Sequence, residues 1–287
     1  MLNSSNELAV ETRGLVKEFG KLRAVDTLEL SVGRDEIYGF LGPNGAGKTT
    51  TIRILTGTSR PTSGRALVGG VDIVKDPVGA KRHIGVVSQH INIDADLTVA
   101  ENLHLHGLLH GMDKPSRLKR IRELLEFADL ADRERSLART LSGGMKRKLT
   151  IIRALMHEPR ILFLDEPTTG LDAASRRRMW ELVRTIHEGG VCVFLTTHYI
   201  EEAEALCSRV GIIHKGSIIA EGTPEELIKK SGEYAVDVVD DGRTETSCFP
   251  SREAAAEFLE SSGHAGRLRP TNLEDLFLQE TGRRVHL

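Results

Sequence analysis

Apolar and polar positions alternate over short runs in the first forty residues, which is typical of short, partly antiparallel strands. The runs are "LAVETRGLVKEF" and "LELSVGRDEIYGFL", separated by glycine and charged turns. The last of them, "IYGFL", leads into a glycine-rich loop, and the residues from Thr49 to Leu55 then suit a helix. The pattern therefore predicts a strand, a loop and a helix in the order that a phosphate-binding motif requires.

The middle of the chain changes from strand to helix and back again. "HIGVVSQ" (83–89) predicts a buried strand, and a helical insert is expected at about 91–156. Within the insert, the positions with helical apolar spacing are Leu103, Leu118, Ile121, Leu125 and Leu130. "ILFL" (161–164) and "VCVFL" (191–195) are continuous apolar runs, as in parallel strands buried on both faces. The polar residues that follow them are expected to line a site.

The pattern changes again near residue 232, so we expect a main domain at 1–231 and a small accessory domain at 232–287. The second part predicts a strand pair joined at "DDGR", followed by two short helices. Ser251 and Thr271 are the expected N-caps, the latter with Glu274 placed for a capping box, and Gly282 is the expected helix stop.

Composition narrows the classes of function. The chain has 287 residues and 4% aromatic residues. Its formal net charge of −2 gives no electrostatic case for sequence-independent nucleic-acid binding. Cys192, Cys207 and Cys248 are too scattered for a disulfide framework or a zinc motif. We find neither a leader pattern at the start nor an apolar run of about 18 residues, so the chain is not expected to cross a membrane alone.

The glycine loop carries the most specific chemistry. Gly42, Gly47, Lys48 and Thr49 satisfy the pattern G-x-x-x-x-G-K-[ST], in which backbone N–H groups and the lysine hold nucleotide phosphates and the hydroxyl holds magnesium. An ordinary glycine-rich turn is the alternative, and the strand and helix on either side argue against it. The other expected nucleotide-binding positions of the loop are Pro43, Asn44, Gly45, Ala46 and Thr50.

Two further motifs contain candidate groups. In "ILFLDEP", Asp165 and Glu166 end a buried strand, and we expect Asp165 to bind Mg²⁺ and Glu166 to polarise an attacking water. Two solvated acids at a strand end are the alternative, and the preceding glycine loop and buried strand argue against it. In "LSGGMKRKLTIIRAL", Ser142 is placed to cap a basic helix, with Gly143 and Gly144 supplying backbone donors. Taken alone, this motif is more often a merely capped helix than a second anion site.

In combination, these motifs resemble the ATP-binding subunit of ABC transporters. "GPNGAGKT", Gln89, "LSGGM", "ILFLDEP", "TTGLD" and His198 follow the order of that family, and the resemblance covers roughly residues 8–225. It implies an α/β P-loop NTPase fold of the ABC ATPase type, with an antiparallel β subdomain, a helical subdomain and a small α+β C-terminal extension. Met145 departs from the usual LSGGQ, which removes an amide side chain but keeps the serine and glycines.

The resemblance also implies individual roles. Phe19 matches the aromatic residue that stacks on adenine, Gln89 the loop glutamine that contacts magnesium and senses the membrane partner, and His198 the histidine that contacts the γ-phosphate. Asp172 matches the loop that crosses the dimer interface. Two subunits, expected to be identical, pair head to tail so that each "LSGGM" helix closes the other subunit's glycine loop on ATP.

The implied function is ATP hydrolysis coupled to export, on the cytoplasmic side of the membrane and through separate transmembrane permease subunits. "TTHYIEEAE" and "TNLEDLFLQETG" resemble the daunorubicin-resistance-type and nodulation-type exporters, which suggests a hydrophobic drug-like or lipid-like cargo. A soluble ABC ATPase acting on nucleic acid or the ribosome and an importer subunit remain alternatives, and no nucleic-acid partner is expected.

One histidine pair is interpreted as structural. "HLHGLLH" places His106 and His110 four residues apart, which is a possible metal-binding spacing on a helix. The sequence offers no evident third ligand, and Gly107 weakens the helix. We therefore expect no metal there.

Overall fold

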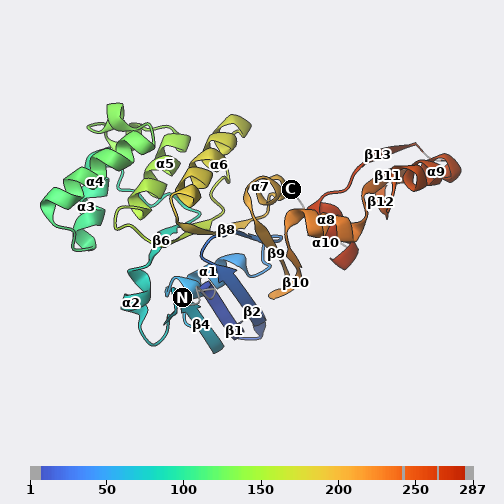
Figure 1. Cartoon of the computed structure of the whole chain (residues 1–287), viewed down its shortest axis with the longest axis horizontal. Helices are drawn as coiled ribbons and strands as arrows, with labels where there is room; N and C mark the ends of the chain where they lie inside the picture. Colours follow the sequence, from blue (N-terminus) through green and yellow to red (C-terminus); the bar gives the residue numbers. More distant parts are fainter. Residues whose placement is uncertain (1–7, 241–242, 264, 282–287) are drawn as a thin grey trace, which may run out of the picture.

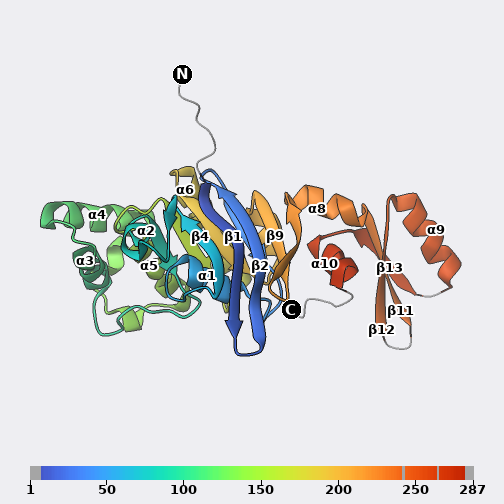
Figure 2. The same ribbon diagram turned by 90° about the horizontal axis from the view of Figure 1, so that it is seen from below.

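The computed structural model describes residues 8–240, 243–263 and 265–281. Three sheets and their helices form an elongated molecule (Figure 1). A central sheet lies between a helical layer on one side and an antiparallel sheet on the other. The C-terminal unit projects from the end opposite the helical layer, as the second view also shows (Figure 2). The arrangement confirms the predicted α/β fold class.

The central sheet has six strands in the order β10-β9-β3-β8-β7-β6. All neighbours are parallel except β10, which forms an antiparallel hairpin with β9. The strands predicted from apolar runs are present, and β3 and β7 are buried at every position. The bounds are β3 Ile37–Leu41, β6 Ile84–Val87, β7 Ile161–Asp165, β8 Cys192–Thr197, β9 Arg209–His214 and β10 Ser217–Gly222.

A four-stranded antiparallel sheet packs beside it, with α1 sharing the same core. Its order is β2-β1-β4-β5, so the strands predicted in the first forty residues are present, although the first two are longer than expected. Ile52, Ile54 and Leu55 of α1 are buried between the two sheets. The bounds are β1 Leu8–Phe19, β2 Leu22–Gly33, α1 Lys48–Leu55, β4 Ser63–Val68, β5 Val71–Asp72 and α2 Pro77–Lys81.

Helices cover the other side of the central sheet. The bounds are α3 Val99–Leu109, α4 Lys114–Phe127, α5 Gly143–Ala154, α6 Ala173–Glu188, α7 Ile200–Leu206 and α8 Pro224–Ser231, with 3-10 turns at Ala131–Arg133 and Ala138–Thr140. Leu118 lies in α4, as its helical spacing predicts, but it is 43% exposed and does not belong to the buried face. Its neighbour Arg117 faces inward instead and donates to the carbonyl of Met112. Within the described residues, every helix is too short or too polar to cross a bilayer.

The C-terminal unit contains one strand that the sequence pattern did not predict. Its bounds are β11 Tyr234–Asp240, β12 Arg243–Phe249, α9 Arg252–Ser262, β13 Gly266–Pro270 and α10 Leu273–Thr281. The additional strand, β13, pairs with β11 in the order β12-β11-β13. Ser251 caps α9 as expected. Gly282 and part of the expected "DDGR" turn lie outside the described residues.

The expected cap of the last helix is displaced by one residue. The Asn272 Oδ1 accepts from the backbone N–H groups of Glu274 and Asp275, at 2.9 and 3.2 Å, and therefore caps α10. Thr271 instead donates its hydroxyl to the carbonyl of Gly232. This hydrogen bond thus connects the start of the C-terminal unit, at Gly232, to the segment that precedes α10.

Helix α10 packs against the main domain, which ends with α8, rather than against the sheet of its own C-terminal unit. Leu276 and Phe277 are buried in the same cluster as Leu227 of α8. Arg269 at the end of β13 makes two hydrogen bonds to the Asp275 carboxylate, at 2.7 and 2.8 Å. The end of the chain therefore completes the main core.

Phe277→Ala should lower the free energy of unfolding by about 3 kcal/mol, because it removes a buried aromatic side chain and leaves a cavity between α8 and α10. Urea denaturation followed by circular dichroism measures the change. Phe258→Ala is the matched control, since Phe258 is 37% exposed and belongs to the outlying unit. Equal losses for the two variants would contradict the role given to α10.

Candidate active site

The site forms where four parallel strands end side by side. In the register of the sheet, Leu41 of β3 pairs with Thr197 of β8, and Asp165 of β7 pairs with Thr196 of β8. Strand β6 pairs along β7, so its end also reaches this edge. The residues that follow these strands are therefore brought together from four separate parts of the sequence.

The glycine loop, residues 42–47, is fitted closely between neighbouring backbones. Gly47 has φ of 111°, and a Cβ on it would lie 2.4 Å from the carbonyl oxygen of Ala24. A Cβ on Gly42 would lie 2.4 Å from the carbonyl oxygen of Ile213. Helix α1 begins directly afterwards at Lys48. The loop thus needs glycine for space as well as for backbone conformation, and it presents a helix N-terminus to the site.

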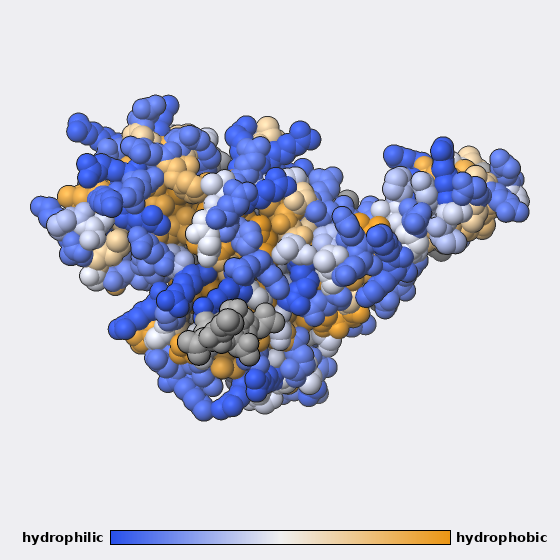
Figure 3. Space-filling model, in the orientation of Figure 1, coloured by the Kyte–Doolittle hydropathy of each residue, from blue (hydrophilic) through white to orange (hydrophobic). Residues whose placement is uncertain are grey.

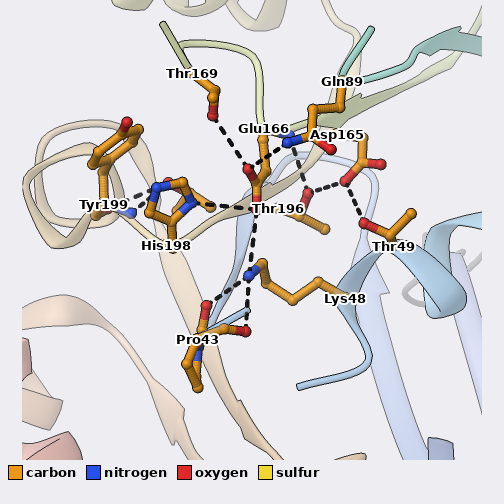
Figure 4. Close-up of polar contacts among 12 residues, drawn as sticks. Pro43, Lys48, Thr49, Gln89, Asp165, Glu166, Thr169, Thr196, His198 and Tyr199 are labelled. Carbon is orange, nitrogen blue, oxygen red and sulfur yellow. Dashed lines mark hydrogen bonds and ion pairs between the residues drawn. The ribbon is translucent and has the colours of Figure 1, made fainter. Parts of the chain in front are cut away.

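Lys48 is buried and points back into the loop (Figure 4). Its Nζ donates to the carbonyls of Gly42 and Pro43, at 2.6 and 3.1 Å, and lies 3.4 Å from Oε1 of Glu166. Burial lowers the pKa of the Lys48 ammonium, while the nearby Glu166 carboxylate opposes that change. The ammonium is therefore held in place by oxygen atoms from the loop and from β7.

Asp165 is held on the side of the site next to α1. Its Oδ1 accepts a 2.6 Å hydrogen bond from Thr196 Oγ1 and lies 3.4 Å from Thr49 Oγ1. These hydroxyl and carboxylate oxygens are ligands of the kind that Mg²⁺ prefers. Thr196 was not among the residues singled out from the sequence, and its position in the "TT" that ends β8 was the available signal.

Glu166 is the point on which the other side chains converge (Figure 4). Its Oε2 accepts from Gln89 Nε2 at 3.1 Å and from Thr169 Oγ1 at 3.2 Å, while His198 Nδ1 lies 3.3 Å from Oε1. The residue has φ of 48°, which is uncommon for a side chain other than glycine and turns the chain sharply out of β7. The carboxylate is thus oriented from several directions before any ligand arrives.

Arg147 was missed in the sequence and holds the surrounding loops together. Its guanidinium donates five hydrogen bonds of 2.7–3.3 Å, all to backbone carbonyls. The acceptors are Pro167, Ser88, Gln89, Asp165 and Glu166. Burial lowers its pKa to about 10, so it remains protonated at neutral pH. The basic run in "GGMKRK" was the only signal in the sequence.

A cleft of about 440 Å³ opens beside the glycine loop. Phe19 stands at its edge, 53% exposed, and the Lys17 ammonium lies 4.9 Å from the ring centroid. An exposed aromatic ring thus stands at one end of the cleft, with Lys17 over one of its faces and polar groups among the other lining residues. The cleft is lined by Phe19, Leu22, Ala24, Asn44, Gly45, Gly47, Lys48, Thr49, Thr50, Gln89 and Glu166.

The "LSGGM" motif borders a different hollow. Ser142 Oγ accepts from the Met145 N–H at 3.3 Å and caps α5, as the sequence predicts. Ser142 and Gly144 line a pocket of about 150 Å³ that shares no residue with the cleft at the glycine loop. Asp172 caps α6 by accepting from the Ser175 N–H at 2.8 Å, and it too is absent from the cleft lining.

A glycine loop that opens a helix beside a strand ending in Asp-Glu defines a P-loop NTPase. The ABC transporter family profile matches residues 25–169. Nod factor export ATP-binding protein I of Cupriavidus metallidurans is 40% identical over 96% of this chain and 98% of its own length. A daunorubicin resistance ATP-binding protein of Streptomyces coeruleorubidus is 44% identical, over 81% of this chain and 74% of its own.

Solved structures agree with the sequence comparison. The ATP-binding subunit of an ABC transporter superposes with a TM-score of 0.70 at 27% identity, covering 77% of this chain and 92% of that one. An ATP-binding cassette solved as a post-hydrolysis dimer with ADP and phosphate gives 0.67 at 27% identity, covering 75% and 98%. The chain belongs to the ABC transporter family of ATP-binding proteins. It is an ATPase of that family and binds adenine nucleotides.

Replacing Arg147 tests the loop arrangement. Arg147→Met should lower the free energy of unfolding by about 3 kcal/mol, because buried carbonyls lose charged donors, and should reduce ATP turnover with it. Urea unfolding and a phosphate-release assay measure the two effects. Lys146→Met removes the same charge from the same helix and serves as the control. Unchanged stability in the Arg147 variant would contradict its proposed clamping of the loops.

Proposed function

We propose that this chain is the ATP-hydrolysing subunit of an ABC exporter, working as a head-to-tail pair on separate permease subunits. The observation that carries the proposal is the convergence of Lys48, Gln89 and His198 on Glu166 at the end of β7. These groups supply a cation, an amide and an imidazole around one carboxylate. That combination suits in-line attack of water on a phosphoryl group.

The glycine loop is the proposed phosphate site. Backbone N–H groups of the loop and the N-terminus of α1 favour an anion, and Lys48 adds a charge whose Nζ already lies at the loop. The contacts of Lys48 with loop carbonyls and with Glu166 are ones that a phosphate can replace. Adenine is proposed to stack on the exposed ring of Phe19 at the edge of the cleft.

Thr49, Asp165 and Gln89 are the proposed holders of Mg²⁺. The donor set fits this ion, since it offers a hydroxyl, a carboxylate and an amide oxygen at one edge of the sheet. When bound, the ion neutralises phosphate charge. Thr196 keeps the Asp165 carboxylate in place through the 2.6 Å hydrogen bond.

Glu166 is the proposed general base that orients and polarises the attacking water. Gln89 and Thr169 hold one carboxylate oxygen, while the other faces Lys48 and His198. His198 is proposed to contact the γ-phosphate. A carboxylate fixed by several neighbours loses little freedom on reaching the reactive arrangement, which lowers the cost of positioning the water.

Two copies are proposed to complete each other's sites. Ser142, Gly143 and Gly144 offer a helix N-terminus away from the cleft, and a Cβ on Gly143 would meet nothing within 4 Å in this chain. Packing within one copy therefore gives no reason for glycine at 143, whereas close approach of a second copy's nucleotide does. Asp172 is proposed to lie at that interface, positioned by its cap of α6.

Export through a separate permease is supported by the relatives named for Nod factor export and daunorubicin resistance. Apolar side chains also gather over the helical layer of α3, α4 and α5 (Figure 3). Leu105, Leu108 and Leu109 of α3 are 45%, 50% and 77% exposed. We propose that this layer docks on a permease at the cytoplasmic face of the membrane, and that the cargo is drug-like or lipid-like.

Two other functions are less well supported. A soluble ATPase acting on nucleic acid lacks electrostatic support, because the chain carries a formal net charge of −2. An importer subunit would use the same chemistry, so it differs only in the partner and direction. The export-named relatives favour the exporter.

Glu166→Gln should reduce ATP turnover by about 10²- to 10³-fold while leaving ATP binding intact, because the amide keeps the shape but cannot accept a proton. Phosphate release and nucleotide binding measure the two quantities. With binding preserved and hydrolysis slow, the variant should accumulate as an ATP-dependent dimer in size-exclusion chromatography.

Glu181→Gln on the face of α6 is the matched control and should behave as the unaltered protein. Near-normal hydrolysis by the Glu166 variant would overturn the role of this carboxylate. Loss of hydrolysis without dimer formation would leave the base in place and contradict the two-copy arrangement.

Affinity purification from detergent-solubilised native membranes tests the partner. A stoichiometric multi-spanning protein is expected, and its addition should change the ATPase rate. Replacing Leu105 and Leu109 together by Ser should reduce its recovery without abolishing hydrolysis by the isolated subunit. Recovery of ribosomal proteins or nucleic acid in place of a membrane protein would contradict the export proposal. It would not contradict the proposed ATPase chemistry.

A further inference from the structure

Three histidines meet at the junction between the helical layer and the central sheet. His106 and His110 come from the end of α3, and His157 follows α5, in the turn before β7. One ring nitrogen from each lies within 4.8 Å of the others. The rings of His110 and His157 are stacked, with centroids 3.7 Å apart. The pair that the sequence left without a third ligand therefore has a candidate for one in His157.

A close approach between the two segments brings the third histidine into place. A Cβ on Gly107 would lie 2.7 Å from Cδ of Arg117 and 3.1 Å from the Met156 methyl group. Glycine at this position thus allows α3 to pack directly against the residue before His157. The capping box at Thr98 secures the other end of α3, so the helix tolerates the glycine that the sequence pattern counted against it.

Hydrogen bonding leaves suitable nitrogen atoms unpaired. Nε2 of His157 lies 2.9 Å from the carbonyl oxygen of Ile84, so it carries the proton and Nδ1 has a lone pair. Nδ1 of His157 and Nε2 of His106 are buried and have no hydrogen-bond partner within the described part of the chain. Burial also lowers the pKa of His157 to about 4 and that of His106 to about 3, which keeps both rings neutral.

We propose that His106, His110 and His157 bind one divalent transition-metal ion of the zinc class, with water completing its coordination. Neutral imidazoles are ligands for such ions, whereas Mg²⁺ and Ca²⁺ require oxygen donors that this cluster lacks. The hydrogen bond from His157 to Ile84 orients the ring in the way that second partners of metal-binding histidines do.

Two features set the expected strength of the site. Nitrogens around a tetrahedral zinc at about 2.0–2.1 Å lie ~3.4 Å apart. Two parallel stacked rings cannot both direct an in-plane lone pair at one ion, so the exposed His110 must rotate out of its stack on His157 for the three nitrogens to converge. The Arg153 guanidinium adds a nearby positive charge, although its donors are directed to the backbone and side-chain oxygens of Asn92, at 2.6 and 2.5 Å. These features favour a reversible site over a permanent structural one.

Metal binding would connect elements that otherwise meet only by packing. The ligands come from α3 and from the turn between α5 and β7, and the Ile84 carbonyl belongs to β6. Helix α3 also carries the exposed Leu105, Leu108 and Leu109. A bound ion would thus fix the orientation of the helical layer on the sheet, at the layer that we propose meets the permease.

Titration of the full, nucleotide-free chain with Co²⁺ and Zn²⁺ tests the site directly. The protein should carry no polyhistidine tag, and nucleotide is left out so that the metal position at the glycine loop does not contribute. One Co²⁺ per chain is expected, with visible absorption of a nitrogen-ligated ion and no thiolate-to-cobalt band from the cysteines. Zn²⁺ should displace it and raise the Tm.

His110→Ala should weaken Zn²⁺ binding by about tenfold or more and abolish the rise in Tm, since one of three ligands is lost. It alters an exposed side chain, so the fold should be retained. His106→Gln should have the same effect on binding. His90→Ala, an exposed histidine outside the cluster, is the control and should bind as the unaltered protein does.

Equal Zn²⁺ affinity in the unaltered protein and both cluster variants would overturn the proposal, as would absence of Co²⁺ binding. The readouts are metal stoichiometry, absorption and Tm, none of which depends on ATP turnover. A failed export proposal would therefore leave this inference untouched, and the reverse also holds.

Discussion

The buried guanidinium of Arg147 is the interaction on which the geometry of the site depends. A charge taken out of water is costly unless its donors are satisfied, and here five hydrogen bonds to backbone carbonyls satisfy them. Those carbonyls belong to the loop after β6 and to the end of β7. Because Arg147 sits on α5, the same contact ties the helix that begins at Ser142 to the loops that carry Gln89 and Glu166. The two proposed anion sites of one chain are thus connected through one side chain.

Opposite charges then hold the side chains of the site in place. Lys48 and Glu166 are both nearly buried and lie 3.4 Å apart, so each offsets the cost of burying the other. The Asp165 carboxylate accepts a hydrogen bond from the hydroxyl of Thr196. A phosphate entering the loop would compete with Glu166 for Lys48 and release the carboxylate toward water. Binding and activation of the base would in this way be linked through a single ammonium group.

Local patterns in the sequence predicted the parts that local chemistry decides. The strand before Gly42, the loop itself, the Asp165 and Glu166 pair and the cap at Ser142 depend on neighbouring residues, and all are present as expected. Contacts between residues far apart in the sequence could not be predicted from local patterns. Arg147, Thr196 and His157 gain their positions from tertiary packing, and β13 has an ordinary mixed pattern that only its pairing with β11 makes a strand. Leu118 had the right spacing, but the rotation of α4 buried Arg117 in its place.

The return of α10 to the main core has a consequence for biosynthesis. Translation proceeds from the N-terminus at about 5–20 residues per second, and domains generally fold as they emerge. Phe277 and Leu276 cover apolar surface on α8, which is made about fifty residues earlier. For a few seconds the nearly complete ATPase therefore exposes part of its interior to solvent. Chaperone binding at α8 and rapid degradation of chains that stop early are the expected cellular signatures of this order of assembly.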